Sequence, residues 1–206
     1  MTTIFTVLPG PQMFEIIRNQ LKVVLDFELN AIGTLDINFV VPTVYVERMY
    51  GFDSATEFPA INITYASGEY KLKNKKGTRG EYLFNIGIYT NSPTVNEEGV
   101  ITDGDKLAAL KMQRIAGFVR TILESYCYFK LELDTTNIAC SEVLSFDIVD
   151  KSRFQDALSD ICGRIQLKVT AEESNVTKTV TTILEGNDTM ISKENSNVGH
   201  SIIYNQ

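Results

Sequence analysis

Two runs of sequence decide the fold, FPAINITY at residues 58–65 and YLFNIGIYT at residues 82–90. Apolar and polar residues alternate in both runs, and this period of two is typical of strands that bury one face. The segment between the runs is rich in Gly and Lys and too short for a crossover helix. The two runs are therefore expected to pair as an antiparallel hairpin that supplies the core of the protein.

The connecting segment, residues 68–81, is predicted to be a long hairpin loop with an unusual charge. It carries five basic residues in a chain whose net charge is -7: Lys71, Lys73, Lys75, Lys76 and Arg79. Long loops often hold binding residues, whereas Lys at a hairpin end is often only solvated and discourages edge pairing. The five cations are the candidate partner-binding residues, and a merely solvated loop is the alternative.

Composition limits the classes of protein to consider. The chain has 206 residues, of which 44% are hydrophobic, and this suits one globular domain with an appendage. Its acidic balance argues against a surface that binds nucleic acid throughout. No apolar run reaches the length of a membrane span, and a signal-peptide pattern is not found, so a membrane partner is not expected. Three widely spaced cysteines, Cys127, Cys140 and Cys162, fit reduced thiols in the cytoplasm.

Helical and strand periodicities complete the predicted fold. Apolar spacing predicts a helix over residues 12–29 that stops at Asn30–Gly33, and a second helix from a cap at Asp103 or Asp105 to about Ser125. The buried stripe of the second helix is expected to comprise Leu107, Leu110, Ile115, Phe118, Ile122 and Tyr126. Further strands are expected at residues 35–41, 142–149 and 161–170. The simplest packing is an α+β fold, an antiparallel sheet of about four strands with both helices on one face.

A change of composition at Ala171 suggests a boundary. Residues 171–206 are rich in Thr, Ser, Asn and Glu and have few apolar side chains. Ordering each backbone residue costs about 1–2 kcal/mol, which such a segment recovers poorly by itself. We therefore expect an α+β domain over residues 1–170 and a C-terminal extension over residues 171–206 that a neighbouring subunit holds in place.

Catalytic and metal-binding patterns are nearly absent from the sequence. His200 is the single histidine, and no Walker loop, Gly-x-Ser-x-Gly elbow or dinucleotide fingerprint occurs. One arrangement remains as an alternative: Asp53 followed by Glu69-Tyr70-Lys71, as in nucleases whose carboxylates hold Mg²⁺ and whose lysine lies near the attacking water. Three matching residues arise readily by chance, so the expectation is no enzyme, no cofactor and no metal.

The order of these elements resembles that of the tail terminator, or tail-completion, proteins of tailed bacteriophages. The resemblance covers residues 12–170 and rests on the N-terminal helix, on two hairpin segments, on the second helix and on a closing strand pair: Phe58–Ile61, Ile86–Thr90, Arg114–Leu123, Leu144–Val149 and Ile165–Val169. Members of the family usually end soon after the last strand, so the segment beyond Ala171 departs from the pattern.

The resemblance implies a structural virion protein without catalysis. Such proteins form a ring, commonly of six copies, that caps the tail tube and offers a surface to the neck or head connector. The implied partners are further copies, the tube protein and the connector, with DNA in the channel as a transient partner. The implied place is the tail or neck of a virion that assembles in the host cytoplasm. Another head-to-tail connector, the nuclease and a cytoplasmic binding module remain as alternatives.

Overall fold

A computed structural model describes residues 11–49, 51–52, 56–73, 77–93, 95–97, 100–133, 138–149, 161–174, 190–191 and 200–201. The chain divides into two compact units, Met1–Val176 and Thr177–Gln206. In the second unit, β8 (Met190–Ile191) pairs antiparallel with β9 (His200–Ser201). The candidate surfaces below all belong to the first unit.

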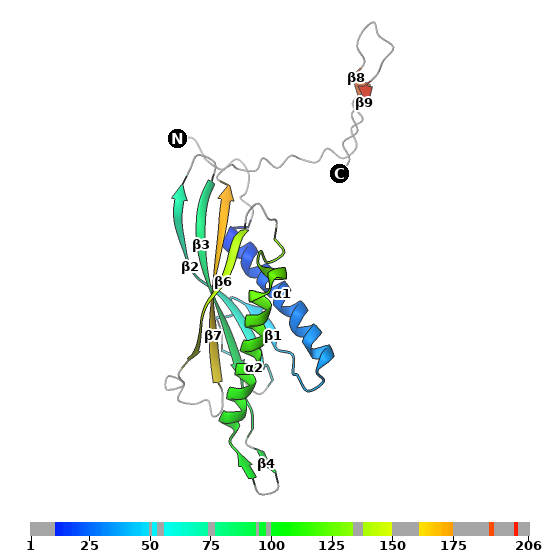
Figure 1. Ribbon diagram of the computed structural model, residues 1–206, viewed down its shortest axis with the longest axis vertical. Coiled ribbons are helices and arrows are strands. Elements are labelled where there is room, and N and C mark those ends of the chain that lie inside the picture. Colours follow the sequence, from blue (N-terminus) through cyan, green and yellow to red (C-terminus); the bar gives the residue numbers. More distant parts are fainter. Residues whose placement is uncertain are drawn as a thin grey trace. The chain divides into compact units, whose positions relative to one another are not determined.

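The first unit is built on a five-stranded sheet against which two long helices pack (Figure 1). Its elements in chain order are α1 (Met13–Leu35), β1 (Thr43–Val46), β2 (Ala60–Lys73), β3 (Gly77–Thr90), β4 (Val95–Glu97), β5 (Val100–Thr102), α2 (Gly104–Glu124), a 3-10 turn (Tyr126–Tyr128), β6 (Ile138–Val149) and β7 (Ile161–Ser174). The strand order is β1-β2-β3-β7-β6, and β4 and β5 form a separate small hairpin.

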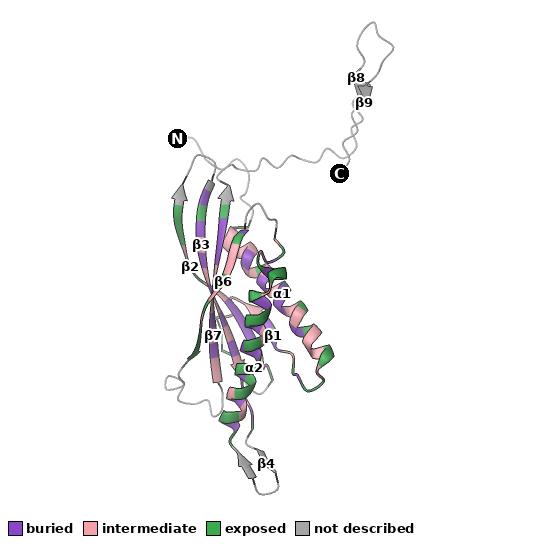
Figure 2. Cartoon of the chain, viewed as in Figure 1, coloured by how far each residue is buried: buried purple, intermediate pink, exposed green. Residues whose placement is uncertain are grey.

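The core lies between one face of this sheet and the two helices. Ile63, Ile86 and Ile165 stand side by side across β2, β3 and β7, and all three are buried. Helix α1 contributes Leu21 and Leu25 to the same core, and α2 contributes Met112 and Val119. Figure 2 shows buried residues on the inner sides of both helices. Burying each such side chain stabilises the fold by about 1.5–3 kcal/mol, so the alternation in the two opening runs does set the core.

The α+β class is confirmed, but the expected sheet of about four antiparallel strands was wrong in one respect. The sheet has five strands and is mixed, because β1 pairs with β2 in the parallel sense. A parallel pair needs a long connection, here residues 47–59, and contacts at that range leave no local pattern in the sequence. The four residues of β1 are also too few for a clear alternation.

The expected helix end and the strand after it were also wrong. Helix α1 continues through Asn30 to Leu35, since the Asn30 amide donates to the Asp26 carbonyl of its own helix at 2.6 Å. Gly33 packs so tightly that an added Cβ would lie 2.3 Å from a methyl of Val41. Residues 36–42 form a turn and loop, and the alternation over residues 35–41 produces no strand.

The expected buried stripe of the second helix was correct only in part. Leu110 is 54% exposed, and Tyr126, at 94%, lies beyond the end of α2. Ile115 and Ile122 are buried as expected, and α2 also buries Gly104, Ala108, Met112, Ala116, Val119 and Leu123. The helix is therefore rotated from the expected orientation, because small residues such as Ala108 and Ala116 face the sheet and let the helix approach closely.

Most of the expected loop at residues 68–81 is strand. Strand β3 pairs along its whole length with β7, and β2 follows it with register shifts between Tyr65 and Ser67 and between Tyr70 and Leu72. Polar sequence extends as strand here because β3 lies between two partners that satisfy its backbone groups. The turn itself, residues 74–76, is outside the described residues.

Candidate assembly surfaces

The end of the β2–β3 hairpin carries the basic residues singled out from the sequence. The structure places Lys71 and Arg79 as exposed side chains, and it places the backbone of Lys73 in β2. Lys75 and Lys76 lie outside the described residues. Of the five predicted cations, the structure therefore describes the side chains of two.

Lys71 is not a free cation. Its Nζ lies 2.8 Å from Oε2 of Glu81 and 3.4 Å from Oε2 of Glu69. The hydrogen bond to Glu81 raises the pKa of Lys71 and lowers the pKa of the Glu81 carboxyl. Arg79 opposes Glu172 of β7 in the strand register and contributes to the lowered pKa of Glu81. The described part of the hairpin end thus carries acidic as well as basic side chains.

The nuclease arrangement can be placed only in part. Glu69 and Lys71 form an exposed ion pair on β2, and Asp53 is outside the described residues. Within the ranges that the structure describes, no group of three His, Cys, Asp or Glu side chains could hold a metal ion. The same part of the chain has no helix long and apolar enough to cross a membrane.

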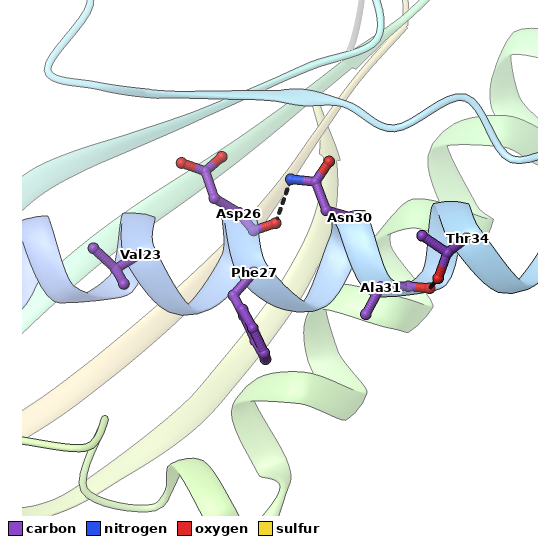
Figure 3. A pocket seen from close by; sticks show the side chains of 6 residues that line it. All are labelled: Val23, Asp26, Phe27, Asn30, Ala31 and Thr34. Atoms are coloured by element: carbon purple, nitrogen blue, oxygen red, sulfur yellow. Dashed lines mark hydrogen bonds between the residues drawn. The ribbon is translucent and has the colours of Figure 1, made fainter.

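The outward side of α1 is a surface that the sequence prediction missed (Figure 3). Val23 and Phe27 are 56% and 69% exposed, and with Ala31 and Thr34 they follow one another along the helix at a spacing of about one turn. They line a shallow depression together with Asp26 and Asn30. The absence of charged residues at Val23, Phe27, Asn30, Ala31 and Thr34 is the signal that could have revealed it.

Polar groups on this side of α1 are already satisfied within the helix. The Asn30 amide donates to the Asp26 carbonyl, and the Thr34 hydroxyl donates to the Ala31 carbonyl at 2.6 Å (Figure 3). Asp26 forms an ion pair with Lys22, one turn earlier. A partner that covered this surface would therefore leave few hydrogen-bonding groups without partners. This lowers the free-energy cost of removing the surface from water.

A second apolar surface follows β6, the last strand of the described sheet. Leu144 and Ile148 are 46% and 57% exposed, and Phe146 lies between them. Phe146 and Ile148 oppose Ile165 and Gly163 of β7, so they stand on the face that carries the helices. Helix α2 contacts this strand, yet the side chains of Leu144, Phe146 and Ile148 stay partly exposed. The alternation predicted the strand correctly but could not show that it lies at an edge.

The other face of the sheet is closed at one end by aromatic rings. The Arg48 guanidinium lies 4.8 Å and 4.5 Å from the ring centroids of Tyr45 and Phe52 and forms an ion pair with Glu57 at 2.6 Å. The rings of Phe52 and Tyr89 are 4.8 Å apart, and burial raises the pKa of Tyr89 to about 12. These contacts explain how the long β1–β2 connection is held, and they form no catalytic arrangement.

No family model matches the sequence, and no curated protein matches it. Among solved structures, the chain is similar to a chain of the virion of a native gene transfer agent (GTA) particle, with a TM-score of 0.44 and 13% sequence identity. The similarity covers 79% of this chain and 100% of that chain. At this level it identifies neither a family nor a function.

Proposed function

We propose that the protein is a structural virion protein that forms a ring capping the tail tube of a tailed phage and joins the tube to the neck or head connector. The observation that carries the proposal is the order of the elements in the first unit. A helix, a long hairpin, a second helix and a closing strand pair are what the tail terminator resemblance implies, and α1, β2–β3, α2 and β6–β7 follow in that order.

The character of the described surfaces favours assembly over catalysis. The outward side of α1 and the outer part of β6 expose large apolar side chains, and such surfaces commonly mark sites of protein contact. The Glu69–Lys71 pair, in contrast, lies open to solvent on a strand. A protein that acts through contacts with its neighbours needs exposed apolar surfaces and does not need a catalytic ion pair.

Electron microscopy of the parent particle, with an antibody against this protein, tests the proposal. We expect a closed ring of label density where the tube ends below the neck. A ring elsewhere in the neck would support the alternative connector, and a single copy off the particle axis would contradict ring formation altogether. Magnesium-dependent cleavage of plasmid DNA by the purified protein, lost in Lys71→Ala, would support the nuclease instead.

The hairpin end is proposed to dock on an acidic surface of a ring neighbour or of the tube protein. Electrostatic complementarity of this kind sets register and association rate more than affinity. Replacing Lys71, Lys73, Lys75, Lys76 and Arg79 together by Ser should weaken particle assembly. The matched control, with Lys106 and Arg120 of α2 replaced by Ser, should assemble as the wild type does.

DNA in the channel is the competing target of the hairpin end, and salt dependence separates the two. Contact with about four phosphates would give a log–log slope near -4 for duplex binding. Lost DNA binding with normal assembly would support the DNA target, and unchanged results in both assays would leave the hairpin end as solvated charge.

The C-terminal extension is proposed to gain its order from a neighbouring subunit. Strand β7 runs to Ser174, and Ala171 is buried within the sheet opposite Gly80. A deletion that spares the sheet should therefore remove Thr177–Gln206, the second unit. We expect this variant to keep the urea stability of the first unit and to assemble poorly. Loss of folding would mean that the segment belongs to the core.

A further inference from the structure

A cavity of about 180 Å³ lies where α2 meets the loop after α1 and the segments next to β2 and β3. Phe39, Phe58 and Ile115, one from each of three segments, supply its apolar wall. An apolar cavity of about 150 Å³ is large enough for benzene, whereas sites for drug-sized ligands span about 300–1,000 Å³. The cavity therefore has room for a compact group the size of one ring, and it is too small for a nucleotide.

Hydrogen bonds hold the segments around this cavity in place. In the loop after α1, the Phe39 N–H donates to the Asp36 carbonyl at 2.9 Å, and the Asn38 N–H donates to the Asp36 carboxylate at 3.0 Å. At the end of β3, the Thr90 hydroxyl donates to the Ala108 carbonyl of α2 at 2.8 Å. A ligand would therefore enter a site that is already formed, and such preorganisation favours binding.

The charge of the lining is opposite to that of the whole chain. The net charge of the chain is -7, yet the described lining residues include two cations, Lys111 and Arg114, one turn apart on α2, and no acid. Among the described residues, Lys111 has only a neutral partner, the Ser92 hydroxyl, at 3.3 Å from its Nζ. Arg114 donates from Nη2 to Asp36 at 2.6 Å, and its guanidinium carries further N–H donors.

We propose that this cavity binds a carboxylate carried by a compact apolar group. The carboxylate would lie at Lys111 and Arg114, where charge-assisted hydrogen bonds are about twice as strong as neutral ones. The apolar wall favours such a ligand over inorganic phosphate, which has no apolar part. The C-terminal residue of a partner protein and a free organic acid share this chemistry. The inference goes beyond the proposed function and does not depend on it.

Titration calorimetry of the full chain with benzoate tests the charge requirement. Benzamide, which has the same shape and no charge, is the matched ligand. We expect benzoate to bind with millimolar affinity and benzamide about tenfold more weakly, because benzamide lacks the charge-assisted hydrogen bonds. Lys111→Met should weaken benzoate binding about fivefold. Lys106→Met, at an exposed lysine of α2 that does not line the cavity, should leave it unchanged.

Methyl NMR spectra of the wild type locate the ligand without any variant. The benzoate ring should shift the methyl signals of Val40 and Ile115, which line the cavity, and leave those of Ile148 on β6 unchanged. A short peptide that ends in Phe with a free carboxylate separates the two sources of ligand. Binding tighter than that of benzoate would indicate a protein C-terminus, and weaker binding would indicate a free organic acid.

Several results would overturn the inference. They are the absence of benzoate binding at about 10 mM ligand, equal affinities for benzoate and benzamide, and methyl shifts that spare Val40 and Ile115. An equal loss of affinity in Lys111→Met and Lys106→Met would show a response to general charge and would also contradict the site. None of these results bears on the ring. A particle without the ring would refute the proposed function and leave the carboxylate site intact.

Discussion

Helices α1 and α2 pack on the same sheet, yet their outward sides differ in how many apolar side chains they expose. Both bury an apolar stripe in one common core. The outward side of α2 carries charged groups, among them the Arg120–Glu124 ion pair, as is typical of a helix side that faces water. The outward side of α1 also has an ion pair, Lys22–Asp26, but beside it Val23 and Phe27 are exposed one turn apart, whereas α2 exposes Leu110. The two sides of a helix are therefore under different constraints. The inner side stabilises the fold, and the composition of the outer side indicates whether a partner or water covers it.

The largest effects should come from the inner stripes, and they should be similar in the two helices. Leu25→Ala in α1 and Met112→Ala in α2 each remove a side chain that is 0% exposed. The expected loss is about 2–5 kcal/mol in the free energy of unfolding, measured with urea. If one variant lost less than about 1 kcal/mol, that helix would not belong to the common core.

A smaller effect is expected where the turn after α2 is tied to α1. The Tyr128 hydroxyl donates to the Glu28 carboxylate, and this hydrogen bond raises the pKa of Tyr128 from 10.0 to about 12. Because the pKa in the folded state is the higher one, the contribution is complete below pH 10 and is lost as the pH rises through about 12. Tyr128→Phe should cost about 1 kcal/mol at neutral pH.

The alkaline pH profile checks that assignment. The wild type should lose stability as the pH rises from 10 to 12, and Tyr128→Phe should lose less over the same interval. Tyr89, with a pKa raised by burial to about 12, supplies part of the loss that remains. Identical profiles in the wild type and the variant would show that Tyr128 does not couple α1 to the turn.

The outer ion pair between the helices should matter less still. The guanidinium of Arg114 in α2 lies 2.6 Å from Asp36, which follows the last residue of α1, and the Arg114 side chain is 55% exposed. Arg114→Ala should cost about 0–1 kcal/mol, and added salt should reduce the difference. A loss that salt does not change would indicate that packing on Phe118, 5.7 Å away, is the main contribution.

The smallest effect on stability should come from the outer stripes themselves. Phe27→Ser in α1 and Leu110→Ser in α2 should each change the free energy of unfolding of the monomer by no more than about 0.5 kcal/mol. Only the α1 variant should weaken particle assembly. A large loss of stability in Phe27→Ser would show that Phe27 supports the fold, and the contrast between the two outer sides would then disappear.

Local patterns predicted what local interactions determine. The alternation in β3 and β7 identified both strands, and Ile165, Leu167 and Val169, which alternate with polar residues, are buried. The alternation over residues 35–41 misled, because the chain turns at Asp36, so that Leu35 and Ile37 are exposed while Phe39 and Val41 reach the core. The parallel pairing of β1 depends on a long connection that no short window of sequence reveals.

The candidate surfaces were predicted less well than the fold. The basic residues were visible in the sequence, but the ion pair of Lys71 with Glu81 depends on strand register, which composition does not give. Periodicity locates the buried side of a helix, and Leu21 and Leu25, four residues apart in α1, are both buried. It assigns the other side to solvent by default, so Phe27 was passed over although Val23 and Ala31 lie one turn to either side of it.

Electron cryomicroscopy of the parent particle, at a resolution that traces the helices, can show both the ring and what covers α1. We expect a closed ring of this protein at the end of the tail tube, in which a neighbouring protein covers the outward side of α1 in every copy. A particle in which this protein forms no ring, or a ring in which α1 faces solvent on every copy, would contradict this expectation.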